Sequence, residues 1–397
     1  MGASLNWPET MKTESGEEFL IARGGPFFEL QRQIGLAREN ALNSGRRALV
    51  FVFLTAVVPV ALAFLTHGAV TALSILKEPD FLARFVLFVA ICFLMERSLE
   101  TRLKNFLERF DDSGLLDEVQ RQKSASAVAR ALKLRNLATA DAVCLALAIV
   151  ASIASLRIRL ADGGGGWIME EIDGTHTLSI AGWWITTVSS AIFWFLVFRW
   201  LWRILIWAIL LSWISRLDMR LVATHPDRFG GLGFIAAYPN AFAPLIFAMS
   251  SVPAAAAFKK LNDQTMDVAT YGTLMTAWLA LVLAVFMLPL LSFSRPLSHL
   301  KATTLKEADI LSTLFQRASE RKVFNRNLSG PPDEAIAAEV PDPSAIRKAA
   351  TSLRTVPFSR NAVLPLSVAA LAPLLIAGAT QLPFKDLLKT AKSLLIL

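Results

Sequence analysis

The sequence predicts an all-α fold, a polytopic membrane bundle of seven helical spans with a helical layer on its cytoplasmic side. Of the 397 residues, 54% are hydrophobic, and the mean hydropathy is +0.49. Only 18% are charged, whereas soluble domains contain about 25%. Residues 183–213 form an apolar stretch that only Arg199 and Arg203 interrupt, and a spanning helix needs about 20 such residues.

Seven segments have the length and composition expected of membrane spans. In chain order they are 48–65, 79–95, 137–156, 183–213, 233–258, 272–293 and 361–382. The second is short and contains Arg84. The seventh contains Pro365 and Pro373, so a re-entrant or broken segment, which would leave six spans, is the alternative there.

The distribution of basic residues predicts the orientation in the membrane. Most of them lie in residues 1–47, 96–136, 215–232 and 295–360, and few lie in 66–80, 157–182 and 259–269. Because basic loops favour the cytoplasmic side, we expect the N-terminus inside and, with seven spans, the C-terminus outside. The first 25 residues lack the apolar core of a signal peptide, so we expect the first span to direct insertion.

The spans divide the chain into predicted domains. These are a cytoplasmic arm with an amphipathic helix (1–47), a bundle of six spans (48–293) with a cytoplasmic helical insert (96–136) and an outer loop (157–182), a cytoplasmic helix with a proline-rich linker (294–360), and the seventh span or re-entrant segment with the C-terminal tail (361–397). Asp173 and Gly174 predict a β-hairpin in the outer loop. Apolar residues at helical spacing in 96–135 and 301–325 predict packing against neighbouring helices.

The fourth span is longer than the hydrocarbon core, so either it tilts strongly or its C-terminal part enters the cytoplasm and packs on the cytoplasmic helices. In the second case Arg199 and Arg203 lie near the inner interface. Charges inside a span are costly unless they are paired or face a cavity. We expect Asp141, near the cytoplasmic end of the third span, to pair with Arg199 or Arg203 or to cap its own helix. The alternative is that the arginines hold an anion.

These charges, together with the prolines of the fifth span, predict a pore or solute-binding site. The candidate residues are Arg199, Arg203, Asp141, Pro239 and Asn240. Proline frees a backbone carbonyl, and transporters use such broken helices at binding sites. A helix that is simply kinked is the alternative interpretation.

The most distinctive polar stretch follows the fourth span, at residues 225–234. In one interpretation it is a turn in which Asp227 caps the next helix and Arg228 anchors at headgroups. In the other it is an inner gate or a small-ligand site, with His225 titrating near neutral pH. The predicted gate residues are His225, Asp227, Arg228, Gly230, Gly231 and Gly233.

This stretch resembles a loop found in uncharacterised multi-pass inner-membrane proteins of bacteria. The residues that carry the resemblance are His225-Pro226-Asp227-Arg228 and Gly230-Gly231-Leu232-Gly233-Phe234, with Arg216-Leu217-Asp218 before them. The resemblance implies a location in the bacterial inner membrane. Because that family has no assigned activity, it transfers no catalytic residue.

The sequence lacks the motifs of the common enzyme classes, such as His-Glu-x-x-His, Gly-x-Ser-x-Gly, the Walker sequence and Cys-x-x-Cys. The histidines are scattered along the chain, so we expect no metal, no other cofactor and no catalytic residue. The net charge of +8 comes from basic loops beside apolar spans, which argues against nucleic acid as a partner.

The leading hypothesis is therefore a channel or transporter for ions or small solutes, embedded in the lipid bilayer as a homo-oligomer. The alternative is a membrane-anchored sensor or assembly scaffold that binds a cytoplasmic protein partner. A third hypothesis is a membrane-embedded enzyme that acts on lipid, with His225 and Asp227 as acid and base.

Overall fold

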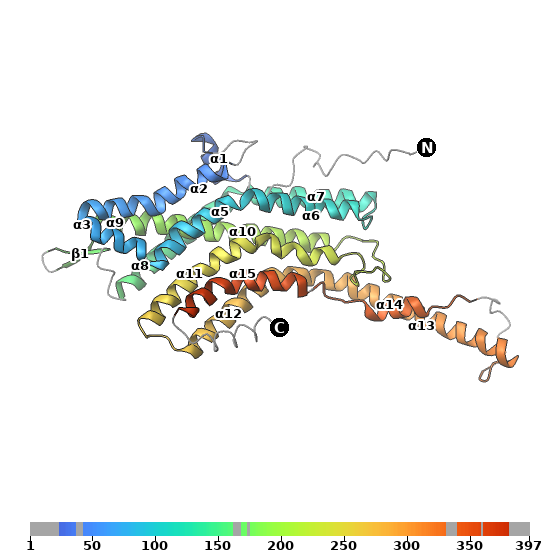
Figure 1. Ribbon diagram of the computed structural model, residues 1–397. Coiled ribbons are helices and arrows are strands. Elements are labelled where there is room, and N and C mark those ends of the chain that lie inside the picture. The colour runs from blue at the N-terminus through green and yellow to red at the C-terminus, as the bar shows by residue number, and fades with distance from the viewer. Residues whose placement is uncertain are drawn as a thin grey trace, which may run out of the picture.

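A computed structural model describes residues 24–36, 43–161, 168–172, 175–330, 340–358 and 360–380. Nearly all of its elements are helices that run side by side between two ends (Figure 1). The hairpin end carries the two strands, and the charged end carries α6, α7, α13 and α14. The elements are α1 (Pro26–Gln33), α2 (Ser44–Val52), η1 (Phe53–Val57), α3 (Val58–Lys77), α4 (Pro79–Phe81), η2 (Leu82–Phe88), α5 (Val89–Leu94), α6 (Glu96–Asp112), α7 (Glu118–Arg135), α8 (Ala138–Ala161), β1 (Met169–Ile172), β2 (Thr175–Leu178), α9 (Ile180–Trp184), η3 (Ile185–Ser189), α10 (Ser190–Ile214), η4 (Gly233–Phe242), α11 (Ala243–Asn262), α12 (Val268–Met287), η5 (Leu288–Phe293), α13 (Ser294–Phe324), α14 (Ser344–Ser352) and α15 (Arg360–Ala379).

Six helical runs within the described residues are long and apolar enough to cross a membrane. They are Ser44–Lys77, Ala138–Ile158, Ile180–Ile214, Gly233–Asn262, Val268–Phe324 and Ala362–Ala379. The chain is thus a multi-pass membrane protein with the predicted helical bundle, and six of the seven predicted spans correspond to these runs.

The predicted second span, 79–95, is a shorter helical run formed by α4, η2 and α5. It returns from the hairpin end toward the charged end and leads through Met95 into α6 (Figure 1). Most of its aromatic side chains face the interior of the bundle, while Leu82 and Leu94 are exposed. Phe81, Phe85, Phe88, Cys92 and Phe93 are all buried. The run therefore packs as part of the bundle, although it is too short to count among the six longer ones.

The predicted seventh span is continuous within the described residues. Helix α15 contains Pro365 and Pro373 but remains helical through both, and it packs along α11 and α12. This geometry favours a full helix over the re-entrant alternative. Residues 381–382 of the predicted span lie outside the described part of the chain.

Helix α10 decides between the two alternatives for the long fourth span. Its C-terminal half packs against α7. The Arg130 guanidinium lies 4.6 Å from the Trp213 ring centroid, and the ring centroids of Phe106 and Trp207 are 5.5 Å apart. The C-terminal part of the helix therefore packs on the charged helices, which favours the second alternative.

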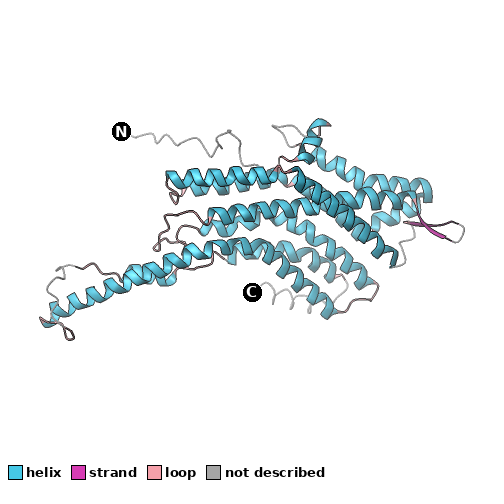
Figure 2. Ribbon diagram, turned by 180° about the vertical axis from the view of Figure 1, so that it is seen from behind, coloured by secondary structure: helices cyan, strands magenta, loops and turns pink. Residues whose placement is uncertain are grey.

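The charged end contains two helical pairs. Helices α6 and α7 form a hairpin whose turn follows Asp112 and contains Ser113 and Gly114. Helices α13 and α14 project away from the remainder of the molecule (Figure 2). The Lys301 ammonium donates to the carbonyls of Thr351 and Leu353, which fixes α14 on α13. Helix α14 begins within the predicted linker, and residues 331–339 of that linker lie outside the description.

The predicted outer-loop hairpin is confirmed. Strand β1 pairs antiparallel with β2, with Met169 opposite Leu178 and Ile172 opposite Thr175. The Asp173-Gly174 turn itself falls outside the described residues.

Candidate functional site

The first part of the candidate site is a cluster of paired charges inside the bundle. Arg47 of α2 and Arg203 of α10 both bind the carboxylate of Glu96, which begins α6. The Arg203 Nη1 atom lies 3.3 Å from Glu96 Oε1. These side chains are between 1% and 4% exposed. Because burial removes the solvation of a charge, each of these three charged groups needs the others as counter-charges, and removing one would destabilise the fold.

Arg199, one helical turn before Arg203, pairs with a different carboxylate. Its Nη1 atom lies 3.2 Å from Asp141 Oδ2 in α8, and the two side chains are only 6% and 13% exposed. The pairing expected between Asp141 and one of the two arginines therefore occurs with Arg199. Each arginine binds a carboxylate, so the geometry supports paired charges rather than an anion held by unpaired arginines.

The N-terminal helix α1 is attached to this cluster. The Phe27 amide donates to Asp141 Oδ2 at 3.1 Å, and Arg199 Nη2 donates to the Gly24 carbonyl at 3.2 Å. The Arg199 guanidinium also lies 4.7 Å from the Phe27 ring centroid. Gln31, one helical turn after Phe27, accepts from Arg47 Nε. The cluster therefore joins α1 to α2, α8 and α10.

The second part of the candidate site is formed by three π-helical stretches, η1, η2 and η3, which lie in three different helical runs of the bundle. Contacts join η1 to both η2 and η3. A π-helix is rare and occurs most often as a single turn at a functional position. We call this region the π-helical centre, defined by residues 53–57, 82–88 and 185–189.

Side chains link the three stretches by donating to backbone carbonyls of a neighbour. The Thr55 hydroxyl lies 2.8 Å from the Phe85 carbonyl of η2 and 2.8 Å from the Phe51 carbonyl of its own helix. Trp184, directly before η3, donates its indole N–H to the Leu54 carbonyl of η1 at 2.9 Å. Irregular helix turns leave carbonyls without their usual donor, and in an apolar layer these carbonyls must find another partner.

Two buried serines lie in the same part of the bundle. Ser189 ends η3 and is fully buried, and Ser152 of α8 is 4% exposed. Neither hydroxyl oxygen has a hydrogen-bond partner among the described residues, and α8 packs against η3. Unsatisfied buried hydroxyls cost free energy, so they mark a place where a polar ligand would be stabilised.

The part of the fifth span that contains Pro239 is a 3₁₀-helix, whereas Pro253 lies inside the α-helix α11. Pro239 and Asn240 lie in η4, which is long for this helix type. The backbone carbonyl of Asn240 accepts a hydrogen bond from Arg102 at 3.4 Å. The side-chain Oδ1 atom of Asn240 is buried without a partner in the described part of the chain. Neither residue contacts the charge cluster through any described hydrogen bond.

The predicted gate loop is organised around Asp227. One carboxylate oxygen accepts from the amides of Phe229 and Gly231, at 2.8 and 3.2 Å, and the other accepts from Gly233 at 2.7 Å. His225 Nδ1 lies 2.8 Å from Asp227 Oδ1. Burial raises the pKa of Asp227, but these hydrogen bonds outweigh it, so the pKa lies below its ordinary value.

The glycines of this loop have a steric role. Gly230 and Gly231 adopt positive φ, and a Cβ atom on Gly233 would lie 2.9 Å from the Asp227 Cβ atom. Arg228 also has positive φ, and its carbonyl accepts from the Arg354 amide at 2.9 Å. Asp227 therefore caps the start of η4, as the structural interpretation of the loop predicts.

The structure does not bring the loop and the charge cluster together. Arg203 lies about 16 Å along the axis of α10 from the end of that helix at Ile214, and the loop follows it. The loop instead packs on Leu115, Leu297 and Leu300, near the α6–α7 turn and on α13. Within the described residues, no group of three or more His, Cys, Asp or Glu side chains could hold a metal ion.

Sequence reasoning missed Arg47, Glu96 and the π-helical centre. Arg47 and Glu96 each stand one residue outside a predicted span, 48–65 and 79–95 respectively, in segments that the sequence assigns to the cytoplasmic side. Their position directly beside a span was the available signal. A comparison of the chain with protein-family models, with curated proteins and with solved structures finds no match.

Proposed function

We propose that the protein transports ions or small solutes across the membrane, through the region around the π-helical centre. The observation that carries this proposal is the contact among three π-helical stretches from three crossings, with two buried serine hydroxyls nearby. Carbonyls and hydroxyls at this depth offer a polar ligand the partners that the surrounding apolar helices lack.

In this proposal the charge cluster is the gate at the charged end. Helix α10 connects the two parts, since η3 precedes it directly and Arg199 and Arg203 lie further along it. Asp141 and Glu96 belong to different elements, so a shift of α10 relative to α8 would exchange or break their ion pairs. Helix α1 is hydrogen-bonded to Asp141 and precedes the first span, so it would restrain this movement.

We further propose that the charged end faces the cytoplasm of a bacterial cell, with the protein in the inner membrane as a homo-oligomer. The excess of basic residues at that end supports the orientation. Apolar side chains exposed on the spans, such as Leu147 and Leu281, support contact with lipid or with a second copy.

The test is solute flux in liposomes that contain the purified protein in known orientation. Separate gradients of a monovalent cation, a monovalent anion and a small neutral solute identify what crosses. The variant Arg199→Ala/Arg203→Ala should change the rate because it removes the gate. The control Lys322→Gln/Arg326→Gln should not, because it changes one exposed residue in the last turn of α13 and one just after that helix. Absence of flux in all three gradients, from folded wild-type protein, would contradict the proposal.

The projecting pair of α13 and α14 favours a second candidate function, a scaffold that binds a cytoplasmic protein. Val323 and Phe324 at the far end of α13 are largely exposed. Such a scaffold requires a partner whose co-purification is lost in Val323→Ser/Phe324→Ser while the membrane bundle stays folded. The same variant should leave flux unchanged, which separates the two functions.

A further inference from the structure

A pocket of about 740 Å³ lies at the charged end, between the end of α10 and the start of α13. It is separate from the charge cluster, from the π-helical centre and from the loop around Asp227. Its lining is rich in hydrogen-bond donors. The polar residues that matter most are Ser212, Ser215, Arg216, Ser292, Arg295 and His299.

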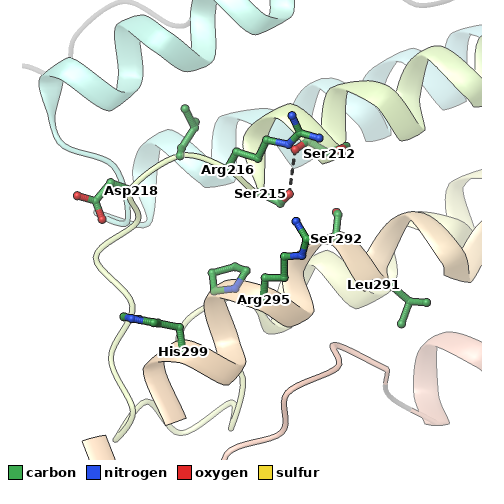
Figure 3. A pocket seen from close by; sticks show the side chains of 10 residues that line it. Ser212, Ser215, Arg216, Asp218, Leu291, Ser292, Arg295 and His299 are labelled. Carbon is green, nitrogen blue, oxygen red and sulfur yellow. Dashed lines mark hydrogen bonds between the residues drawn. The ribbon is translucent and has the colours of Figure 1, made fainter. Parts of the chain in front are cut away.

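Two arginines face this pocket from different elements. Arg216 follows the C-terminus of α10 and Arg295 lies in the first turn of α13, and their guanidinium groups both extend toward Ser215 (Figure 3). Among the described residues, neither guanidinium takes part in a hydrogen bond, ion pair or ring contact. They differ in this from Arg47, Arg199 and Arg203, which are all paired.

The serine hydroxyls add to the same side of the pocket. Ser215 Oγ donates to the Ser212 carbonyl at 2.9 Å, and Ser292 Oγ donates to the Pro289 carbonyl at 2.7 Å. Because a hydroxyl proton rotates freely, either one can turn toward a ligand. Asp218 is the acidic residue of the lining, and it lies across the pocket from both guanidinium groups (Figure 3).

We propose that this pocket binds a phosphate group. Paired guanidinium groups present planar N–H donors that match the oxygens of a phosphate, and hydroxyls supply further donors. Two sources share this chemistry. One is the headgroup of an anionic phospholipid, because Leu288 and Leu291 are exposed at the end of an apolar run beside the pocket. The other is a phosphate-bearing solute in the water phase.

The experiment has one arm for each source and uses the purified full-length chain in detergent. Calorimetric titration with inorganic phosphate tests the soluble source. Native mass spectrometry with added dioleoyl phosphatidylglycerol, against phosphatidylcholine as the zwitterionic reference, tests the lipid source. The double variant Arg216→Gln/Arg295→Gln removes the two facing charges. The control Arg97→Gln/Arg109→Gln removes two exposed charges of α6 that do not line the pocket.

We expect wild-type protein to bind phosphate, to prefer phosphatidylglycerol, or both. We also expect the pocket variant to bind at least about tenfold more weakly, since it loses two charge-assisted contacts. The control should bind as wild type does. Thermal unfolding of each variant checks that it is folded. The proposal is overturned if wild type shows neither a phosphate isotherm nor a preference between the lipids, or if the two double variants behave alike. It does not depend on the transport proposal.

Discussion

Arg199 of α10 and Asp141 of α8 form an ion pair that also holds the N-terminal helix. The same Asp141 oxygen that lies 3.2 Å from Arg199 accepts the Phe27 amide at 3.1 Å. A single carboxylate therefore connects two spans with the segment before the first span. Together with Arg47, Glu96 and Arg203, it forms a charge cluster that joins α1, α2, α6, α8 and α10.

Replacing Asp141 with Asn should destabilise the protein by about 3 kcal/mol or more, because it leaves the buried Arg199 without a counter-charge. Thermal unfolding in detergent measures the loss. The matched control is Asp309→Asn, which breaks an exposed pair with Arg347 and should cost less than about 1 kcal/mol. Equal losses of stability from the two substitutions would show that the buried pair stabilises the protein no more than the exposed pair does.

Thr55→Val should destabilise the bundle by about 1–3 kcal/mol. It keeps the shape of the side chain but leaves the Phe85 carbonyl, buried in the π-helical centre, without its donor. Thr276 provides the comparison, because it is exposed and bonds only the Gly272 carbonyl of its own helix. If chemical unfolding gives the same free energy for Thr55→Val and Thr276→Val, the link between η1 and η2 does not stabilise the fold.

Gly233→Ala should loosen the loop around Asp227, because the added Cβ atom would lie 2.9 Å from the Asp227 Cβ atom. We expect a loss of about 1–3 kcal/mol in unfolding free energy, together with faster proteolysis within 215–232. Gly45→Ala is the control: a Cβ atom there has open space and lies in α2, where alanine favours the helix. Comparable losses at both positions would contradict this role for Gly233.

Asp111→Asn should raise the melting temperature at pH 7.5 but have little effect near pH 4. Burial raises the pKa of Asp111 to about 6, although Arg121 offsets part of this. An aspartate in an unfolded chain has a pKa of about 3.9. The folded state therefore holds the proton of Asp111 more tightly, and the stability of the wild type falls as pH rises from about 4 to about 6. Asparagine removes this loss. Asp112→Asn, at an exposed position, is the control, and a pH-independent effect of Asp111→Asn would contradict the account.

The spans were predictable because apolar runs of sufficient length are a local property of the sequence. The β-hairpin was predictable for the same reason, since turn residues act within a few positions. The pairing of Asp141 with an arginine of the fourth span was predictable because an unpaired charge in an apolar layer has a high free-energy cost.

The π-helical centre could not be predicted in this way. Thr55 bonds the Phe85 carbonyl across two crossings, so the irregular turns are stabilised by packing between helices that are distant in sequence. Arg47 and Glu96 were missed for a related reason. Each lies at a span boundary, where a solvated charge and a buried one look the same in sequence, and only their tertiary contact distinguishes them.

We propose that the π-helical centre lies on a path through the membrane, and the reactivity of a cysteine placed at Ser189 distinguishes such a path from a closed core. In a background with Cys92 and Cys144 replaced by serine, Ser189→Cys is treated in liposomes with a small, charged thiol reagent. Ala63→Cys, equally buried in α3, is the control. If such a path exists, Ser189→Cys reacts in the folded protein, and it reacts faster when Asp141→Asn opens the gate, while Ala63→Cys does not react. Reaction of both cysteines only after unfolding would contradict it.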